Sequence, residues 1–570
     1  MRTLHASATL FTNDAASFTN GAAPITDDAA TCDAGRGHGA VPMFTGAMYH
    51  SCLHAAPSGG RGVRSNRRAT RPGGDVEPIL VAGQWRPAQS SAAMTITNPA
   101  TLEPLGVVPD CDSRDVDAAV AAAQGAQRDW WKVPGVEKAK LLREIGARIR
   151  GREHALARTM TLETGKPISE AVDCIDWVAA CFEYYGEVAR SSYGNSIPPV
   201  APHQINFTIK EPFGVVGAIV PFNFPLLLMA WKVAPAIAAG NTIVCKPPHQ
   251  NPLSNLVMAQ AYDVLPPGVV NVITGGPLTG AALVEHPRVD MIAFTGSTAV
   301  GRRIAVAAAE RLKKVNLELG SVDPFLVFKD ADLDIAVPGV LWARMLNAGQ
   351  VCTSSKRVYV ERAIADDFIA RLAREIDTLV LGDPMRPDTD IGPLISASAA
   401  TAVEAQVARA VAEGARLRRG GRRCRPSGLP GHFVEPTLLT DVRHGSLPTR
   451  EEIFGPVLSV TTVADADEAI RLANDSEYGL GASIYTNDLA VAMRAMEFIK
   501  AGTFWINDPL TDNDAGPFGG MRHSGIGREL GSEGLDAFRE PKHVHLDYVM
   551  ERKPWWFPYR HRPVSGGDPS

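Results

Sequence analysis

Short apolar runs alternate with helical patterns through the middle of the chain, and this alternation limits the fold more than any other feature. The runs, rich in β-branched residues, occupy 215–220, 242–245, 269–273, 291–294 and 315–319. Strands that alternate with helices predict a mainly parallel sheet with right-handed crossovers. We therefore expect an α/β fold, and a second alternating set from 325 to about 504 predicts a second unit of the same kind.

The flanking segments predict further helices and a few edge strands. Helical periodicity extends over 114–127, 136–161, 169–187, 223–239 and 254–265. Further strands are expected at 79–85, 94–98, 203–210 and 542–548. The last of these stands alone near the end of the chain, and an isolated strand usually needs a partner.

The run Val215–Trp231 is apolar enough to raise the question of a membrane span. It contains Pro221, Asn223 and Pro225, and Lys232 follows it directly. A spanning helix needs about 20 apolar residues and tolerates such interruptions poorly. We expect a buried strand, a turn and a helix here, and no membrane partner.

Charge and cysteine content argue against several classes of function. The 570 residues include 57 Lys and Arg against 62 Asp and Glu, a net charge of −5, which leaves no basic footprint for nucleic acid. The 8 cysteines show no CxxC or metal-finger spacing, which favours a reducing compartment. We expect a cytoplasmic protein without a metal site. The HExxH, GxSxG and P-loop signatures are also absent from the sequence.

Residues 1–75 differ from the rest of the chain in composition. They contain no Lys and no Glu but seven Arg, with many Ala, Gly, Ser and Thr. Such a segment cannot bury enough apolar surface to order itself, so we predict a disordered extension. A transit peptide is the functional alternative: Arg and Ser fit it, whereas the acidic residues do not, namely Asp14, Asp27, Asp28 and Asp33.

Two residues are candidates for nucleophilic and general-base chemistry. Cys352 follows a glycine-containing turn in Asn-Ala-Gly-Gln-Val-Cys-Thr, where an accessible loop and a lowered thiol pKa would make it a nucleophile. Glu318 lies at the end of an apolar strand, where burial would raise its pKa toward neutrality, as suits a general base. Each has a structural alternative, because most intracellular cysteines are inert core residues and a strand-end glutamate can pair with a nearby Arg.

Other motifs place polar or small residues at the ends of predicted strands. Asn223, in Pro-Phe-Asn-Phe-Pro, could donate to a developing oxyanion or cap the helix that follows. Gly296 and Ser297 lie in Phe-Thr-Gly-Ser-Thr-Ala-Val-Gly, where small residues would let a phosphate approach a helix N-terminus; an ordinary turn is the alternative, because GxGxxG is absent. Lys246, at a strand exit, and Glu452, in Glu-Glu-Ile-Phe-Gly-Pro, are either ligand-facing or solvated charges.

Taken in order, these motifs resemble the aldehyde dehydrogenase superfamily over about 79–548. Further similar segments are Glu163–Pro167, Asn474–Leu480, Pro517–Gly520, Ser524–Gly525 and Gly527–Glu529. The resemblance implies a non-acylating, NAD(P)-dependent enzyme, because CoA-acylating relatives lack a carboxylate at the position of Glu318. A non-catalytic binding homologue is the alternative from another class; it would have a damaged nucleophile, base or oxyanion donor, and all three are present.

The resemblance also implies a role for each motif. Cys352 is the expected nucleophile, Glu318 the general base and Asn223 an oxyanion donor. The expected cofactor is NAD, with NADP possible, and its expected contacts are Val220, Phe222, Lys246, His249, Gly296, Ser297, Val300, Gly320, Glu452 and Phe454. The expected substrate channel consists of Leu228, Trp231, Asp512 and Phe518.

A division of the chain follows from the same resemblance. The expected parts are a Rossmann-type NAD(P)-binding domain (76–190 and 213–320), an α/β catalytic domain (321–536), a small β oligomerisation arm (191–212 and 537–550) and a C-terminal tail (551–570). In relatives such an arm pairs across subunits, so a homodimer or homotetramer is expected.

Departures from the family pattern bear on the cofactor and on the base. His249 stands where many NAD-using members have a Glu that repels a 2′-phosphate, so NADP becomes more plausible, while NAD is still favoured. Ser321 and Val322 replace the usual Gly-Lys, which predicts less backbone freedom beside Glu318.

The channel residues indicate the class of substrate. Trp231 stands where succinate-semialdehyde dehydrogenases of one branch carry an Arg that would bind a carboxylate. With Leu228 and Phe518 it predicts an apolar, aromatic channel for aliphatic or aromatic aldehydes. The loop 507–516 carries three aspartates, which favour a cationic aldehyde such as an aminoaldehyde or betaine aldehyde; a solvated acidic loop is the structural alternative.

Overall fold

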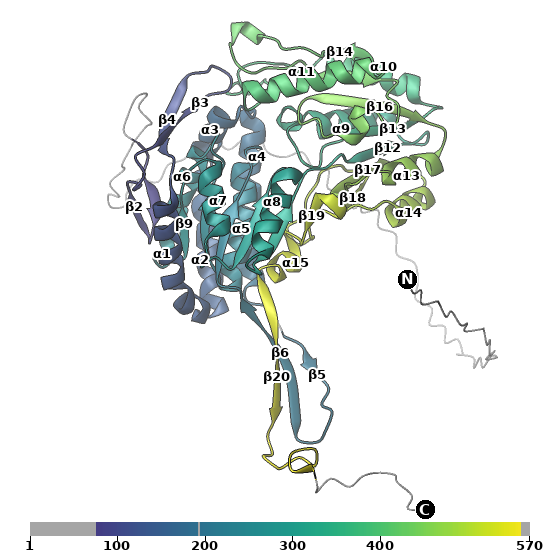
Figure 1. The fold of residues 1–570 in the computed structure, drawn as a ribbon. Helices are drawn as coiled ribbons and strands as arrows, with labels where there is room; N and C mark the ends of the chain where they lie inside the picture. Colours follow the sequence, from purple (N-terminus) through teal and green to yellow (C-terminus); the bar gives the residue numbers. More distant parts are fainter. Residues whose placement is uncertain (1–75, 192–193, 560–570) are drawn as a thin grey trace, which may run out of the picture. The chain divides into compact units, whose positions relative to one another are not determined.

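The computed structural model describes residues 76–191 and 194–559. The predicted extension over 1–75, its transit-peptide alternative and the end of the predicted tail lie outside the described residues. The described chain builds two large sheets covered by helices, a three-stranded arm and a two-stranded ribbon (Figure 1). The α/β class that the alternation predicts is confirmed.

The first sheet has eight strands, and the central ones are parallel, as predicted. In spatial order they are β19 (Gly525–Ile526), β11 (Lys314–Glu318), β10 (Met291–Thr295), β7 (Val215–Ile219), β8 (Thr242–Lys246), β9 (Val270–Val272), β1 (Ile79–Val81) and β2 (Gln84–Arg86). At one edge β19 pairs antiparallel with β11, although it lies within the segment 321–536 that was assigned to the catalytic domain. The first sheet is therefore completed from late in the sequence.

Helices pack around this first sheet (Figure 1). They are α1 (Ser113–Lys132), α2 (Gly135–Arg150), α3 (Glu153–Thr164), α4 (Ile168–Val188), α5 (Pro225–Ala239), α6 (Leu253–Ala259), α7 (Pro277–Glu285) and α8 (Thr298–Ala309). Almost every residue of helix α5 is apolar, and nearly every side chain in it is buried, as expected for a helix without a polar face. The run Val215–Trp231 thus forms β7, a turn and the start of α5, as predicted. Among the described residues, none of the helices is both long and apolar enough to cross a membrane.

The periodic stretch 136–161 forms two helices, where the sequence pattern predicts one. Helix α2 ends before Gly151, whose N–H bonds the carbonyl of Ala147 at 2.9 Å, and α3 starts after Arg152. Glycine is a poor helix former, and the apolar faces of α2 and α3 resume in nearly the same phase. Periodicity alone therefore does not reveal the break.

The second sheet has seven strands and a single antiparallel edge. In spatial order they are β14 (Arg416–Arg419), β15 (Thr437–Thr440), β16 (Val457–Val463), β13 (Arg357–Glu361), β12 (Pro324–Val327), β17 (Gly481–Tyr485) and β18 (Thr503–Ile506). The helices of this part of the chain are α9 (Leu333–Met345), α10 (Ala365–Ile376), α11 (Ala397–Ala412), α12 (Leu447–Arg450), α13 (Ala466–Asn474), α14 (Leu489–Phe498) and α15 (Gly531–Asp536).

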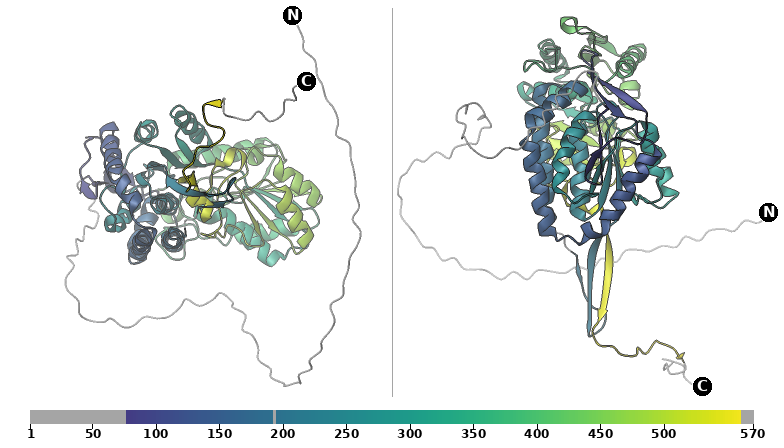
Figure 2. Two further views of the ribbon diagram at one scale, coloured as in Figure 1. Left: turned by 90° about the horizontal axis from the view of Figure 1, so that it is seen from below. Right: turned by 90° about the vertical axis from the view of Figure 1, so that its left-hand side faces the viewer.

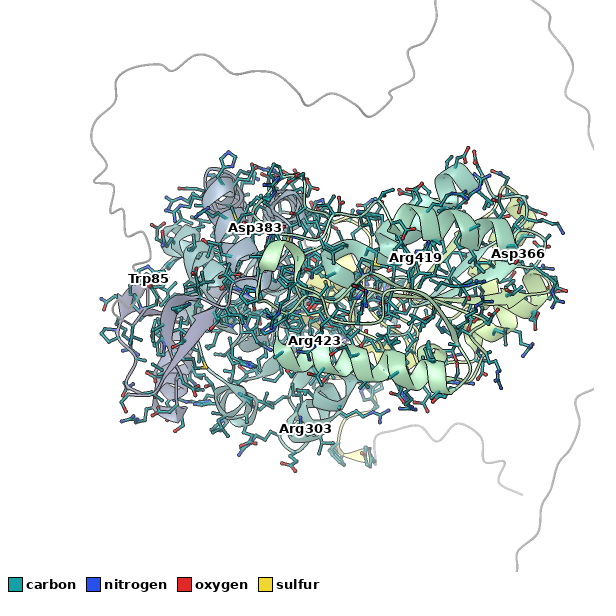
Figure 3. All side chains as sticks on the ribbon, turned by 90° about the horizontal axis from the view of Figure 1, so that it is seen from above. Trp85, Arg303, Asp366, Asp383, Arg419 and Arg423 are labelled. Atoms are coloured by element: carbon teal, nitrogen blue, oxygen red, sulfur yellow. The ribbon has the colours of Figure 1, made fainter. Side chains whose placement is uncertain are left out.

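The face formed by α10, α11 and β14 carries charged side chains, some of them labelled in Figure 3. Arg419 pairs with Asp377 at 2.7 Å, and Arg423 pairs with Glu404 at 2.6 Å. Ion pairs as exposed as these contribute little to stability, because water and salt screen them. The charged side chains of this face are therefore explained by contact with solvent.

The predicted C-terminal strand has its partner in the arm. Strand β20 (Arg539–Asp547) pairs antiparallel with β6 (Gln204–Pro212) along its whole length, and β6 also pairs with β5 (Ser196–Ile197). The arm projects away from the two sheets (Figures 1 and 2). The separate ribbon consists of β3 (Ala93–Thr97) and β4 (Pro104–Pro109).

Candidate active site

Cys352 follows a turn whose backbone adopts an unfavourable conformation. After α9, three successive residues have positive φ: Asn347 at 51°, Ala348 at 53° and Gly349 at 74°. Non-glycine residues in this region cost about 1–2 kcal/mol each, so the surroundings must hold the turn in place.

Buried polar groups supply that support. The Asn347 amide donates to the carbonyl of Asn223 at 3.0 Å, and the Asn347 N–H donates to the carboxylate of Glu170 at 2.9 Å. The fully buried Arg344 donates to the carbonyls of Gly349 and Ile453 at 3.2 and 2.7 Å. The turn that carries Cys352 is therefore fixed from α4, α9 and the loop before α5.

Glu318 ends β11 and is 2% exposed. Neither of its carboxylate oxygens makes a hydrogen bond of ordinary geometry within the described part of the chain, but the Cys352 thiol lies close enough to lower the pKa of the carboxyl. Burial, and then the charge of Glu529, raise the pKa of Glu318 well above its usual value, whereas Lys232 opposes the rise. This agrees with the raised pKa that the sequence predicts for a general base.

The Cys352 thiol departs from the sequence expectation. Its pKa is raised, first by burial and then by the charge of Glu318, and the charge of Lys356 opposes the rise. A lowered pKa was expected for an accessible loop, but Cys352 is only partly exposed, lines the cavity described below and lies close to the Glu318 carboxylate. The sequence could not reveal either effect.

A buried ion pair stands behind the base. The Lys232 ammonium lies 2.6 Å from Glu529 and 2.6 Å from the hydroxyl of Thr295, and both charged side chains are almost fully buried. Thr295 is the register partner of Glu318 in the next strand. Helix α5 thus contributes the positive charge of Lys232, and the segment after β19 contributes the negative charge of Glu529, to the surroundings of Glu318.

The predicted channel residues line one cavity together with Cys352. Trp231 and Phe518 pack at 4.9 Å between ring centroids, and Leu228 and Asp512 contribute to the same wall. The cavity measures about 50 Å³, room for an aldehyde head but not for a long chain. The other residues lining it are Trp177, Phe224, Leu227, Trp342, Leu346, Val351, Thr353 and Leu510.

A larger hollow of about 410 Å³ adjoins this cavity. The two share Trp177, Phe224, Trp342 and Leu346, so the walls are continuous. The outer hollow adds three carboxylates, those of Glu170, Asp173 and Asp390. An aldehyde whose head reaches Cys352 would place its tail here.

The Asn223 side chain lies in the turn before α5 and is 3% exposed. Its Oδ1 has no hydrogen-bond partner within the described residues. Its backbone carbonyl accepts from Asn347, which links the loop before α5 to the turn before Cys352. A buried amide at this junction can act as an oxyanion donor.

The predicted cofactor residues gather at the carboxyl edge of the first sheet. Val220 and Phe222 follow β7, Lys246 ends β8, and Gly320 follows β11. The segment after β10 adds Gly296, Ser297 and Val300, with Ser297 as the cap of α8. Ligands of parallel sheets bind at this edge, beside helix N-termini.

The chemistry of these groups fits a dinucleotide. The buried Lys246 ammonium donates to the carbonyls of Pro247 and Gly275 at 3.0 and 2.9 Å, and burial lowers its pKa to about 8. A Cβ on Gly320 would lie 2.6 Å from Glu452 Oε2, so only glycine lets that carboxylate approach the loop. Phe222 and Phe454 meet edge to face at 5.9 Å.

Two positions depart from the family pattern. His249 is exposed, but the protein still removes part of the water around its ring, and this desolvation together with the charge of Lys246 lowers its pKa and disfavours the protonated form. Ser321 has no positive φ, so it needs none of the freedom of glycine; its N–H donates to Glu452 at 3.4 Å.

Several residues of this site have no role predicted from the sequence. Lys232, Lys356 and Glu529 are buried charges, and Trp177 and Trp342 line the cavity. Lys232 carried a usable signal, because a single charge stands inside an apolar helix pattern. Glu529 lies in a segment that resembles the family, but its partner Lys232 is 297 positions away, so its role could not be predicted.

A parallel α/β sheet with ligand-binding groups at its carboxyl edge, next to a cavity holding a thiol and a carboxylate, is typical of a nucleotide-dependent enzyme with a covalent intermediate. The aldehyde dehydrogenase family model matches residues 85–544. The chain therefore belongs to the aldehyde dehydrogenase family. It is an NAD(P)-dependent enzyme that oxidises an aldehyde.

Relatives and solved structures agree with this assignment. A chloroplastic aminoaldehyde dehydrogenase of Arabidopsis thaliana is 41% identical over 495 residues, covering 84% of this chain and 97% of the relative. The lactaldehyde dehydrogenase structure from Escherichia coli has a TM-score of 0.81 and 39% identity, covering 83% of this chain and 99% of its own. A betaine aldehyde dehydrogenase from Staphylococcus aureus in complex with NAD⁺ has a TM-score of 0.82 and 34% identity, covering 84% and 97%.

Proposed function

We propose that the enzyme oxidises an aliphatic or aromatic aldehyde to its carboxylic acid, with Cys352 as nucleophile, Glu318 as general base and Asn223 as oxyanion donor. The observation that carries the proposal is that Cys352 lines an apolar cavity and lies beside the buried carboxylate of Glu318. The presence of Glu318 argues for hydrolysis rather than transfer to CoA.

The reaction follows from the groups around the cavity. The Cys352 thiolate sulfur forms a bond to the aldehyde carbon as the carbonyl π electrons move to oxygen, and the Asn223 amide and the Cys352 N–H hold the resulting oxyanion. A bound NAD(P)⁺ would supply the acceptor for the hydride of this carbon, and loss of the hydride leaves a thioester on Cys352. Glu318 then takes a proton from water as its oxygen attacks the thioester carbon, the carbon–sulfur bond breaks, and the acid leaves.

The cofactor would be held at the carboxyl edge of the first sheet. We assign its pyrophosphate to the start of α8 at Gly296, Ser297 and Val300, with Gly320 on the neighbouring loop, and its adenine ribose to Lys246 and His249. Glu452 would hold the nicotinamide ribose, and Phe454, Phe222 and Val220 would pack against the cofactor. NAD is the favoured form, and NADP remains the alternative because His249 offers no carboxylate against a 2′-phosphate.

Two substitutions separate the two chemical roles. Cys352→Ala should abolish NADH formation from any aldehyde. Glu318→Gln should leave a burst of about one NADH per active site and lower steady turnover by about 10²–10⁴-fold, because acylation survives and hydrolysis loses its base. Stopped-flow absorbance at the NADH band measures both phases, and steady turnover by Cys352→Ala would overturn the assignment.

A cationic aldehyde is the second candidate, because Asp512 lines the cavity and three carboxylates line the outer hollow. Named relatives include aminoaldehyde and betaine aldehyde dehydrogenases. Asp512 is exposed at the edge of the cavity, but partial loss of its surrounding water and the charge of Asp514 raise its pKa to about 7, so its carboxylate forms as the pH rises through neutrality.

Asp512→Asn tests this candidate. KM for betaine aldehyde, whose charge does not titrate, should be raised about 10-fold at pH 8 and little at pH 6, with no change for hexanal. Assays with benzaldehyde and succinate semialdehyde, each with NAD⁺ and NADP⁺, complete the comparison. An unchanged KM for betaine aldehyde at pH 8 would assign the aspartate to the solvated loop.

We also propose a division into a cofactor domain (76–190 and 213–320), a catalytic domain (321–536) and an oligomerisation arm (191–212 and 537–550). The arm supports a homodimer or homotetramer, because Ile205 and Leu546 are register partners and are 50% and 45% exposed. A cytoplasmic location is supported by the unpaired state of all described cysteines. Relatives named as chloroplastic or peroxisomal make cell fractionation the appropriate test.

A further inference from the structure

Lys356 lies one residue before β13 and is only 2% exposed. Its ammonium donates to the backbone carbonyl of Cys352 and lies 3.0 Å from the carboxylate of Glu452. The side chain thus joins the peptide of the proposed nucleophile to the carboxylate assigned to the cofactor ribose.

Without Lys356, the charges that act on the Cys352 thiol are mainly negative. Three carboxylates, those of Glu318, Asp323 and Glu452, act against ionisation of the thiol, and Lys356 acts for it. The other buried cations nearby have partners elsewhere: Lys232 pairs with Glu529, and Arg344 donates to backbone carbonyls. Lys356 is therefore a buried cation, bonded to the peptide of Cys352, whose charge favours the Cys352 thiolate.

We propose that Lys356 is a positioning residue that fixes the Cys352 peptide against Glu452 and supplies the positive charge that the thiolate needs. The inference rests on the proposed function only in naming Cys352 as the nucleophile and Glu452 as a cofactor ligand. A purely structural lysine, present only to neutralise Glu452, would make the same ion pair but would not affect the thiol.

Thiol alkylation of the cofactor-free enzyme tests the proposal without any turnover. Iodoacetamide labelling rates are followed from pH 7 to 11, so that a midpoint above the usual cysteine value stays in range, and mass spectrometry quantifies the peptide that contains Cys352. In Lys356→Met, which keeps the length of the side chain but removes the charge, the labelling midpoint should rise by about one pH unit or more. Lys356→Arg should stay near the wild-type midpoint. A Lys356→Met midpoint equal to that of wild type would overturn the proposal.

A second pair of variants tests whether Lys356 serves only to neutralise Glu452. It also keeps the test valid if Lys356→Met alone fails to fold. Glu452→Gln removes the carboxylate, and Lys356→Met/Glu452→Gln removes both charges, so no buried charge is left unpaired. The proposal predicts that the double variant labels at a midpoint about one unit above that of Glu452→Gln. Equal midpoints would show that Lys356 serves Glu452 alone.

Wild-type NADH formation is measured in parallel. If wild type oxidises no aldehyde while the midpoints shift as expected, the proposed function fails and the assignment of Lys356 to the thiol stands. If wild type is active and the midpoints coincide, the opposite holds.

Discussion

Individual charged residues around Glu318 determine the pKa of this proposed base. Glu529 is held by Lys232 at 2.6 Å and raises the pKa of Glu318 through its charge. Replacing this carboxylate with an amide removes a negative neighbour and frees Lys232, and both effects favour the Glu318 carboxylate. The pKa of the proposed base is therefore set in part by the Lys232–Glu529 ion pair, and neither residue of this pair lines the substrate cavity.

Glu529→Gln should move the rise of kcat with pH toward lower pH. The shift should be about one unit, provided that hydrolysis of the thioester limits turnover. Steady-state rates from pH 5 to 9 give the midpoint, and Glu137→Gln on the exposed surface of α2 serves as the control. A midpoint that stays in place or moves to higher pH would contradict the electrostatic role.

Some residues of the site could be predicted from the sequence immediately around them, and others could not. Cys352, Glu318 and Asn223 could be named from the sequence because each lies in a short motif with a strand or turn around it. Lys232 and Glu529 are 297 positions apart, so no pattern along the chain joins them. The direction of the Cys352 pKa was wrong for the same reason, since burial and Glu318 determine it.

At the scale of elements, a buried carboxylate holds the start of α6. Glu163, at the end of α3, accepts from the N–H groups of Leu253 and Ser254 at 2.7 and 2.8 Å. Burial raises the pKa of Glu163 to about 7 despite these bonds. Between about pH 4.5 and 7 the folded chain keeps a proton that the unfolded chain has released, so this group makes folding less favourable as pH rises.

Glu163→Gln should reduce the loss of unfolding free energy between pH 5 and pH 7 relative to wild type. The amide oxygen still accepts from the helix start, but the side chain no longer titrates. Urea unfolding at both pH values measures the difference. A loss as large as that of wild type would show that other carboxyls account for the pH dependence.

Elements were predictable where their own residues determine them. Strands β7, β8, β10 and β11 coincide closely with apolar runs, and α5 with an apolar helical stretch. The two-residue β19 could not be predicted, because Gly525–Ile526 becomes a strand only by pairing with β11. The break between α2 and α3 was missed because one glycine interrupts a periodicity that both sides continue.

At the scale of the molecule, the arm presents an apolar surface. Ile205 and Ile209 on β6 and Leu546 on β20 are each more than a third exposed. A strand pair that exposes such residues on both strands is suited to packing against another copy of the chain.

Ile205→Lys/Leu546→Lys should dissociate the proposed oligomer. Light scattering after size exclusion should fall from a multiple of the 60.9 kDa chain mass to the mass of one chain. Thr95→Lys/Val107→Lys, on the separate ribbon of β3 and β4, is the control for added charge. A wild-type protein that already elutes as a single chain would contradict the oligomer proposal.

The pairing of β19 with β11 has a consequence for biosynthesis. Glu318 lies on β11, and the strand that covers the edge of β11 comes from residues 525–526, near the end of the described chain. While the ribosome is still making the second sheet, the first sheet has an open parallel edge next to its proposed catalytic base. The edge of β11 is therefore completed only after residues 525–526 have been made, and a chain that stops before Gly525 should leave this edge unpaired and open to aggregation.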